Sequence, residues 1–290
     1  EDGSFSFENI PYGAWYVREI EQPAGFVLDD TIYPVTIGAD GQVVEIKIVN
    51  KYVRGNIHLT KVDSEYPDNK LTGATFEVYK DSNANGKLDD GDELLGTLTE
   101  KEKGEYSMND LFYGRYFVKE TKAPEGFVLD TGVYEVMIDT GGKTYEVENK
   151  AGVGFVNDAM RGNLKIVKTS SDGKVKGFAF RITGANGYDI ILETNDKGEI
   201  FIDGLRIGDY TISEVSNSAS SMYVLPADKK ATVKLGSTTI VEMHNVLRDT
   251  PKTGDTTNLP LLYALAGLSA VGIAVCGVIG FKKKKKEDRN

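Results

Sequence analysis

The sequence is poor in the residues that crosslink small domains or catalyse reactions. It contains one cysteine, Cys276, so no disulfide can form within the chain. Its two histidines, His58 and His244, are isolated from each other and indicate no metal centre. The sequence also lacks a nucleophile elbow, a P-loop, an HExxH motif and a dinucleotide fingerprint. Nothing in this inventory supports an enzyme with a substrate of its own.

The sequence also has fewer basic residues than acidic ones. Lysine and arginine number 34 against 44 acidic residues, which gives a formal net charge of −10 over 290 residues. Such an acidic chain is unsuited to binding nucleic acid or anionic lipid. With 40% hydrophobic residues it is typical of a globular protein, and its length allows two or three domains. Because the chain opens at Glu1 without a secretion signal, we interpret it as part of a longer precursor.

A single long hydrophobic run lies near the C-terminus. It extends from Leu259 to Phe281 without a charged residue, and the lysines 282–286 follow it directly. At ~1.5 Å per residue, a helix of this length crosses a hydrocarbon core of about 30 Å. The lysine cluster predicts a cytoplasmic C-terminus, with everything before the run outside the cell.

A short polar motif precedes the hydrophobic run. Its residues are Thr250, Pro251, Lys252, Thr253 and Gly254. Motif, apolar run and basic tail, in this order, resemble the LPXTG-type cell-wall sorting signal of Gram-positive surface proteins. The resemblance implies that a sortase cleaves after Thr253 and joins the chain to peptidoglycan, so that 259–281 spans the membrane only transiently. Thr250 stands where Leu is usual, which leaves the sortase class open; the alternative is a permanent membrane anchor.

The remaining sequence repeats one unit. The block Tyr12–Asp29 recurs as Tyr113–Asp130, and a shortened copy occupies Ile207–Glu214. A second block, Val49–Lys61, recurs as Val156–Lys168. Internal repeats of this kind mark tandem modules. They divide the chain into a first module at 1–53 that lacks its opening strands, a second at 54–160, a third at 161–248 and the sorting region at 249–290.

Each module has the pattern of a β-sandwich. Short stretches rich in Val, Ile, Tyr, Phe and Thr alternate with Gly, Asp and Asn turns, and helical periodicity is absent. We therefore expect tandem antiparallel β-sandwiches, and almost no helix outside 259–281.

Strand parity places polar side chains among the apolar ones. Lys61 shares a face with Ile57 and Leu59, because alternate residues of a strand point the same way. By the same parity the inward-pointing polar residues are Lys61, Glu120 and Asn157 in the second module, and Lys168, Glu214 and Asn245 in the third. Burying these groups is costly unless they satisfy one another.

An amine, an acid and an amide in one apolar interior can react. Desolvation lowers the pKa of a lysine and raises that of a glutamic acid. A neutral amine can then attack the asparagine carbonyl while the protonated acid moves protons. The products are a Lys–Asn isopeptide bond and ammonia. The alternative is a paired but unreacted polar cluster.

The positions of these residues resemble a known domain family. A lysine on the first strand, a glutamate in Y-x-x-x-E-x-x-A-P-x-G-F and an asparagine on the last strand resemble the Cna B-type or SpaA-type (prealbumin-like) domains of Gram-positive pilins and adhesins. The resemblance implies an all-β chain of reverse immunoglobulin-like sandwiches, followed by one transmembrane helix. It also implies bonds from Lys61 to Asn157 and from Lys168 to Asn245, with Glu120 and Glu214 as proton shuttles.

Two details of this assignment stay open. Asn149 has the same parity as Asn157, and we prefer Asn157 because its flanking residues match those of Asn50. In the first module Glu19 and Asn50 have lost their lysine, so Glu19 is vestigial in this chain.

A separate motif in the second module has the pattern of a calcium loop. Oxygen-bearing side chains alternate, and a glycine stands at the sixth position, as Ca²⁺ loops require. The expected ligands are Asp81, Asn83, Asn85, Lys87 through its backbone carbonyl, Asp89 and Asp92. The alternative is a turn rich in Asn and Asp without an ion.

Together these features predict a secreted, peptidoglycan-anchored stalk of an adhesin or minor pilin, with sortase as its processing partner and a structural Ca²⁺ ion. No cofactor is expected for its chemistry, which is limited to autocatalytic crosslinking. A host ligand or pilin partner cannot be identified from these residues. The rival hypotheses are a polymerising backbone pilin and the spacer of an exported enzyme whose catalytic domain lies N-terminal to these residues.

Overall fold

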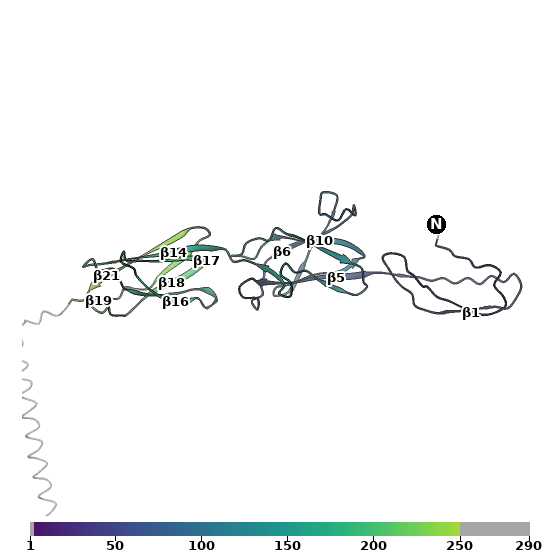
Figure 1. Ribbon diagram of the computed structural model, residues 1–290, viewed down its shortest axis with the longest axis horizontal. Coiled ribbons are helices and arrows are strands. Elements are labelled where there is room, and N and C mark those ends of the chain that lie inside the picture. Colours follow the sequence, from purple (N-terminus) through teal and green to yellow (C-terminus); the bar gives the residue numbers. More distant parts are fainter. Residues whose placement is uncertain (1–2, 250–290) are drawn as a thin grey trace, which may run out of the picture.

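The computed structural model describes residues 3–249, which form three β-rich bodies in a row along one long axis (Figure 1). Within 3–249 no helix has the length and apolar character to cross a membrane. The predicted span at 259–281 and the motif at 250–254 lie outside the described residues.

The first module contains two small antiparallel ladders. Strand β1 (Gly13–Val17) pairs with β3 (Tyr33–Ile37), and β2 (Phe26–Val27) pairs with β4 (Lys51–Tyr52). Large apolar side chains of this module stay exposed, among them Trp15 and Tyr16.

The second module is a sandwich of two sheets. One sheet has the order β11-β10-β6-β7, and the other has the order β12-β5-β9-β8 with β13 also paired to β5. The strands are β5 (Arg54–Asp63), β6 (Thr75–Lys80), β7 (Glu93–Thr97), β8 (Thr99–Glu102), β9 (Glu105–Phe112), β10 (Gly114–Lys122), β11 (Val133–Ile138), β12 (Thr144–Glu146) and β13 (Phe155–Asn157).

The third module repeats this architecture. Its sheets have the orders β17-β14-β21-β19 and β16-β15-β18-β20. The elements are β14 (Arg161–Ser170), β15 (Ala179–Thr183), the short 3-10 helix η1 (Ala185–Gly187), β16 (Asp189–Glu193), β17 (Glu199–Arg206), β18 (Gly208–Val215), β19 (Tyr223–Val224), β20 (Lys229–Val233) and β21 (Thr238–Leu247). In the described part of the chain η1 is the only helix, so the all-β prediction is confirmed there.

The first and last strands of each complete module run parallel, unlike the all-antiparallel pairing expected from the sequence. β5 pairs in parallel with β12 and β13, and β14 pairs in parallel with β21. Parallel neighbours need a long connection between them, and here the rest of the sandwich supplies it. This pairing brings the two ends of a module side by side.

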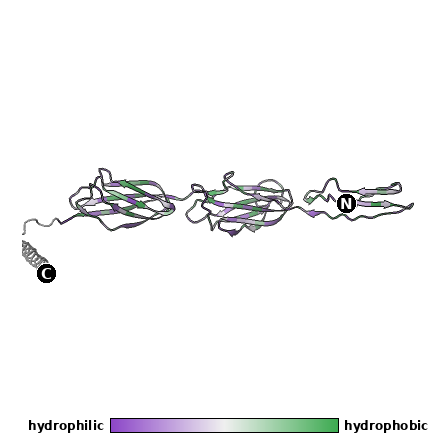
Figure 2. Cartoon of the chain, turned by 90° about the horizontal axis from the view of Figure 1, so that it is seen from below, coloured by the Kyte–Doolittle hydropathy of each residue, from purple (hydrophilic) through white to green (hydrophobic). Residues whose placement is uncertain are grey.

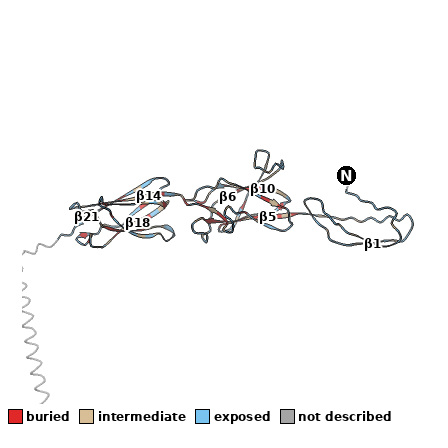
Figure 3. Ribbon diagram, in the orientation of Figure 1, coloured by how far each residue is buried: buried red, intermediate tan, exposed pale blue. Residues whose placement is uncertain are grey.

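The core of each complete module lies between its sheets. Buried residues alternate with partly buried ones along most of β5 and β14, as strand parity predicts (Figure 3). Hydrophobic and hydrophilic residues are interleaved along the strands of both sandwiches (Figure 2), and the buried hydrophobic ones form one core cluster in each. Lys61 and Lys168 belong to the buried set with the aliphatic residues of their strands.

Candidate crosslink sites

Lys61 lies in the core of the second module at the parallel junction of β5 and β13. It is 0% exposed, and Phe155 stands directly opposite in the ladder. Its Nζ donates a 3.0 Å hydrogen bond to the carbonyl of Phe155 and a second one to Oδ1 of Asn157. The predicted nucleophile therefore contacts the side chain that it would attack.

Glu120 reaches the same point from β10 in the opposite sheet. Its Oε2 accepts a 2.8 Å hydrogen bond from Nδ2 of Asn157 and another of 2.8 Å from the backbone N–H of Asp130. Its Oε1 is buried, and among the described residues it has no hydrogen-bond partner. The carboxyl group thus touches the amide nitrogen and keeps one oxygen free.

The environment moves both ionisable groups toward their neutral forms. Burial lowers the pKa of the Lys61 amine to about 8, although the nearby Glu120 charge acts in the opposite direction. Burial likewise raises the pKa of the Glu120 carboxyl, against its hydrogen bonds from Asp130 and Asn157. A neutral amine and a protonated acid are the forms that amide attack requires.

In the third module the acid and the amide meet, while the amine takes another partner. Asn245 Nδ2 donates a 2.6 Å hydrogen bond to Oε1 of Glu214. Lys168 Nζ donates to the carbonyl of Thr169 and lies 4.1 Å from the centre of the Phe178 ring. Within the described residues, Asn245 Oδ1 is buried without a partner. The site has the same three residue types as that of the second module, but here the amine is hydrogen-bonded to a backbone carbonyl instead of the asparagine side chain.

Ladder register and burial nevertheless match between the two sites. Lys168 stands opposite Met243, two residues before Asn245, as Lys61 stands opposite Phe155, two residues before Asn157. Burial lowers the pKa of Lys168 and raises that of Glu214. The hydrogen-bond partner of the lysine amine is one difference between the two sites.

The described part of the first module brings together an acid and an amide. Glu19 Oε1 accepts a 2.6 Å hydrogen bond from Asn50 Nδ2, and Oε2 accepts one of 2.8 Å from the backbone N–H of Asp29. This arrangement repeats the contacts of Glu120 with Asn157 and Asp130. The repeated block that carries the glutamate therefore forms the same glutamate–asparagine contact in the first and second modules.

Asn149 is held away from Lys61. Its Nδ2 donates to Oδ2 of Asp130 at 2.6 Å and to the carbonyl of Val156 at 2.8 Å, and its Oδ1 accepts from the Val156 N–H at 2.7 Å. The two bonds to Val156 attach the Asn149 side chain to the backbone of β13. The geometry therefore brings Asn157, and not Asn149, to the amine.

Sequence reasoning missed Asp130 as part of the site. Its backbone binds Glu120, while its carboxylate binds Asn149, the Tyr134 hydroxyl and the N–H of Gly132. These hydrogen bonds outweigh burial and lower the pKa of Asp130, so it stays charged. The available signal was its place at the end of the repeated block, which Asp29 shares.

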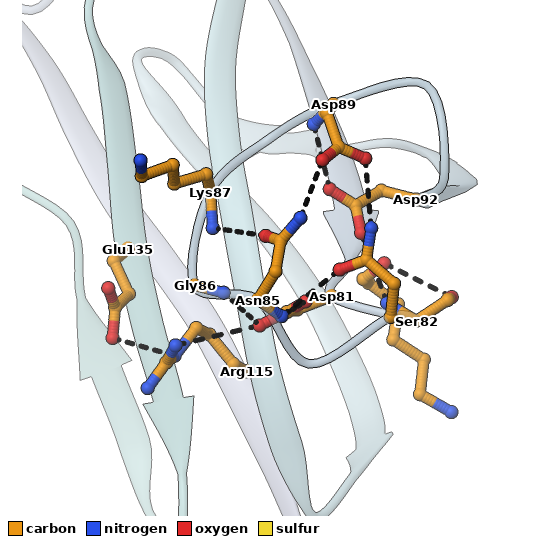
Figure 4. A network of polar contacts seen from close by, with 11 residues as sticks. Asp81, Ser82, Asn85, Gly86, Lys87, Asp89, Asp92, Arg115 and Glu135 are labelled. Atoms are coloured by element: carbon orange, nitrogen blue, oxygen red, sulfur yellow. Dashed lines mark hydrogen bonds and ion pairs between the residues drawn. The ribbon is translucent and has the colours of Figure 1, made fainter.

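The predicted calcium loop closes through its own hydrogen bonds (Figure 4). Asp81 accepts from the N–H groups of Asn85 and Gly86, and the Asn85 side-chain amide donates to Asp89 at 2.6 Å. Arg115 approaches Asp81 at 3.6 Å. In residues 3–249 no group of three or more His, Cys, Asp or Glu side chains is placed to hold a metal ion. The side chains of Asp81, Asn85 and Asp89 are engaged in hydrogen bonds within the loop.

The remaining predicted ligands have partners within the same loop. Asn83 Oδ1 accepts from the N–H of Asn85, and Asn83 Nδ2 donates to Asp89. Lys87 donates its N–H to Asn85 Oδ1, and Asp92 accepts from the N–H groups of Ser82 and Asp89. Such bonds are typical of turns rich in Asn and Asp.

Comparison with known proteins covers all three modules. The family model SpaA, described as a prealbumin-like fold domain, matches residues 1–52, 55–151 and 162–246. The trypsin-resistant surface T6 protein of Streptococcus pyogenes serotype M6 is 29% identical over 194 residues, which are 66% of this chain and 32% of that protein. The chain thus spans about a third of this curated relative.

A solved structure shows the same arrangement of strands. The Bacillus anthracis TIE protein is 25% identical and superimposes with a TM-score of 0.59, over 83% of this chain and 42% of that one. The resemblance drawn from the lysine, glutamate and asparagine positions is confirmed at the level of the family. The chain belongs to the SpaA family of prealbumin-like, pilin-type domains.

Proposed function

We propose that the second module closes an isopeptide bond between Lys61 and Asn157, and that the third closes one between Lys168 and Asn245. One observation carries the proposal most directly. The buried Lys61 amine contacts Oδ1 of Asn157, whose Nδ2 in turn contacts Glu120.

The reaction balances within the site. The neutral Lys61 nitrogen forms a bond to Cγ of Asn157, and the bond from Cγ to Nδ2 breaks. The protonated Glu120 gives a proton to the leaving nitrogen and regains one from the attacking amine, so ammonia departs and Glu120 is restored. The hydrogen bond from Asn157 Nδ2 to Glu120 Oε2 supports this route, since it joins the acid to the leaving group.

The proposed bond suits a protein that bears tension. It joins the first and last strands, which lie side by side in parallel. Such a crosslink limits the unfolded ensemble as a disulfide does, in a chain whose sole cysteine is Cys276. We infer a stalk whose load path passes through covalent bonds.

We further propose that the chain is the wall-proximal stalk of a Gram-positive adhesin or minor pilin. A sortase would cleave between Thr253 and Gly254 and attach Thr253 to peptidoglycan. The order of motif, apolar run and lysines supports this anchoring, and the surface T6 relative is consistent with it. The test is incubation with sortase and a glycine-based nucleophile, in which Thr253→Ala should prevent transfer.

Two rivals make different predictions. A polymerising backbone pilin needs an acceptor lysine for a second sortase, so wall extracts would show a ladder of multimers. A spacer of an exported enzyme would accompany catalytic activity in the full precursor. The stalk hypothesis predicts neither result.

The intact mass of the purified protein tests the crosslinks. Each bond removes one ammonia, about 17 Da, so two bonds give twice this deficit. A mass equal to that of the unmodified chain would refute both bonds. Fragments that stay joined after proteolysis between Lys61 and Asn157 would locate the first one.

A calcium ion at 81–92 is a weaker proposal. Its support is the alternation of oxygen-bearing side chains along the loop. Binding would require the carboxylates to give up part of their present hydrogen bonds.

A further inference from the structure

Both joints between modules use one linker residue that is hydrogen-bonded on each side. At the second joint the N–H of Met160 donates to the carbonyl of Gly126 at 2.8 Å, and its carbonyl accepts from the N–H of Ile207 at 3.0 Å. Gly126 belongs to the second module and Ile207 to the third. The linker residue therefore ties the two modules together through the backbone.

The first joint has the same backbone relay. Val53 donates to the Gly25 carbonyl at 2.8 Å and accepts from the N–H of Tyr113 at 3.0 Å. Because the two joints have the same pair of backbone hydrogen bonds, we look to their side chains for a difference in stiffness.

At the second joint a charged side chain crosses between the modules. Arg206, at the end of β17, donates from Nη1 to Asp63 Oδ2 at 2.6 Å and from Nη2 to Asp63 Oδ1 at 2.8 Å. Nη2 also lies 2.8 Å from Glu65 Oε2. Parallel bonds of this kind fix a guanidinium in orientation as well as in position.

The contact is shielded from water. The Asp63 side chain is 0% exposed and that of Arg206 is 15% exposed. The guanidinium lies 4.9 Å from the ring centre of Tyr66 and 5.9 Å from that of Phe127, both in the second module. We call Asp63, Glu65, Tyr66 and Phe127 the arginine socket. Breaking such a buried pair on one side is strongly unfavourable, because it leaves an uncompensated charge.

The first joint has a different side-chain chemistry. Phe112 ends β9 as Arg206 ends β17, and its ring meets that of Tyr52 edge-on at 5.5 Å. Arg54 stacks on Phe112 and pairs with Asp110 of its own module, whereas the corresponding Arg161 pairs with Glu65 across the joint. Apolar contact is less directional than a bidentate ion pair.

The socket stands on the strands that carry the proposed crosslink. Asp63 lies opposite Asn157 in the parallel ladder, and the N–H of Ser64 donates to the Asn157 carbonyl at 3.2 Å. Asp63, which binds Arg206 in the arginine socket, is therefore two residues from Lys61 along β5.

We propose that the downstream end of the second module is a docking surface for an arginine of the following module, and that Arg206 in this socket locks the second joint in one orientation. The first joint, held by the same backbone relay and by aromatic contact, is the looser of the two. The stalk is then a rod with one rigid and one compliant joint. The lock does not depend on the crosslinks.

Limited trypsin digestion of the full-length protein tests the lock, because Arg54 and Arg161 place cleavage sites at matching positions of the two joints. Arg206→Gln should raise the cleavage rate after Arg161 by at least about tenfold, since the joint then opens more readily. Cleavage after Arg54 should stay unchanged and serves as the internal reference. Asp63→Asn should act in the same direction.

A matched control and a second readout separate locking from folding. Arg181→Gln removes the exposed pair with Asp189 far from the joint and should leave both rates unchanged. Residual dipolar couplings should give the second and third modules one common alignment tensor in the parent and two in Arg206→Gln, with dispersed amide spectra in both. Equal cleavage after Arg161 and a retained common tensor would overturn the proposal. An ammonia deficit equal to that of the parent, beyond the mass change of the substitution itself, would show that the crosslinks are unaffected.

Discussion

The Asn157 side chain donates a 2.8 Å hydrogen bond to Glu120 although the two residues lie on strands of opposite sheets. β13 brings the amide in parallel beside β5, and β10 presents the acid across the core. Side chains from the first strand, the last strand and β10 therefore meet in the interior of the sandwich.

Glu120→Ala should restore one ammonia, about 17 Da, beyond the mass change of the substitution itself. Removing the acid leaves the leaving nitrogen without a proton donor, so the bond in the second module does not form. Intact-mass spectrometry measures the effect. The control is Glu19→Ala in the first module, which should change the mass by the substitution alone. A full two-ammonia deficit in Glu120→Ala would show that this carboxyl is dispensable.

Asn157→Ala should abolish the second-module bond, whereas Asn149→Ala should retain it. Lys61 contacts Asn157, while Asn149 is occupied by Asp130 and Val156. Peptide mapping of both variants would identify the acceptor. Loss of the bond in Asn149→Ala together with its survival in Asn157→Ala would reverse the assignment.

Lys61→Met should lower the free energy of unfolding of the second module by about 4–5 kcal/mol, the value expected for releasing a loop near 100 residues. Methionine keeps a long apolar side chain in the core, so the change reports mainly the crosslink. Denaturant unfolding followed by a probe in this module measures it. Lys168→Met is the parallel variant in the third module, and it should leave the second module's midpoint in place. A loss below about 1 kcal/mol would argue against a bond at Lys61.

Bond formation in the second module should accelerate as pH rises toward about 8, the pKa of the buried Lys61 amine. Below that value most of the amine is protonated and cannot attack, so in the range where Glu120 keeps its proton the rate should fall ~tenfold per pH unit. Raising the pH beyond the elevated pKa of Glu120 opposes this gain, because it removes the proton that the leaving group needs. The fraction crosslinked during cell-free synthesis at several pH values, read by mass, gives the profile. A rate independent of pH would contradict a titrating amine.

Calcium, if it binds the loop 81–92, should protect this segment from proteolysis and raise the thermal midpoint of the second module. Ligand binding to the folded state alone stabilises it by mass action. Asp81→Asn should remove the effect, and Asp196→Asn, at an exposed surface pair in the third module, should not. Calorimetric titration with Ca²⁺ that releases no heat would leave the loop as a turn closed by its own hydrogen bonds.

Local pattern was enough to predict the β architecture and the inward direction of Lys61, Glu120 and Lys168. Strand parity is a property of consecutive residues, so it can be seen without knowing which strands are neighbours. Which strands are neighbours depends on contacts between distant residues, and parity carries no information about them. Parity gives Asn149 and Asn157 the same face, and it cannot tell which of them stands beside Lys61.

The sequence by itself therefore determined the repeated blocks, the β class and the types of residue that enter each core. Only the tertiary structure decided the parallel pairing of first and last strands, the contact between Lys61 and Asn157, the direction of the Lys168 amine and the insertion of Arg206 into the socket at Asp63. The reason is physical. Which face a side chain takes depends on the residues next to it, whereas its partner is fixed by packing between segments far apart in the chain.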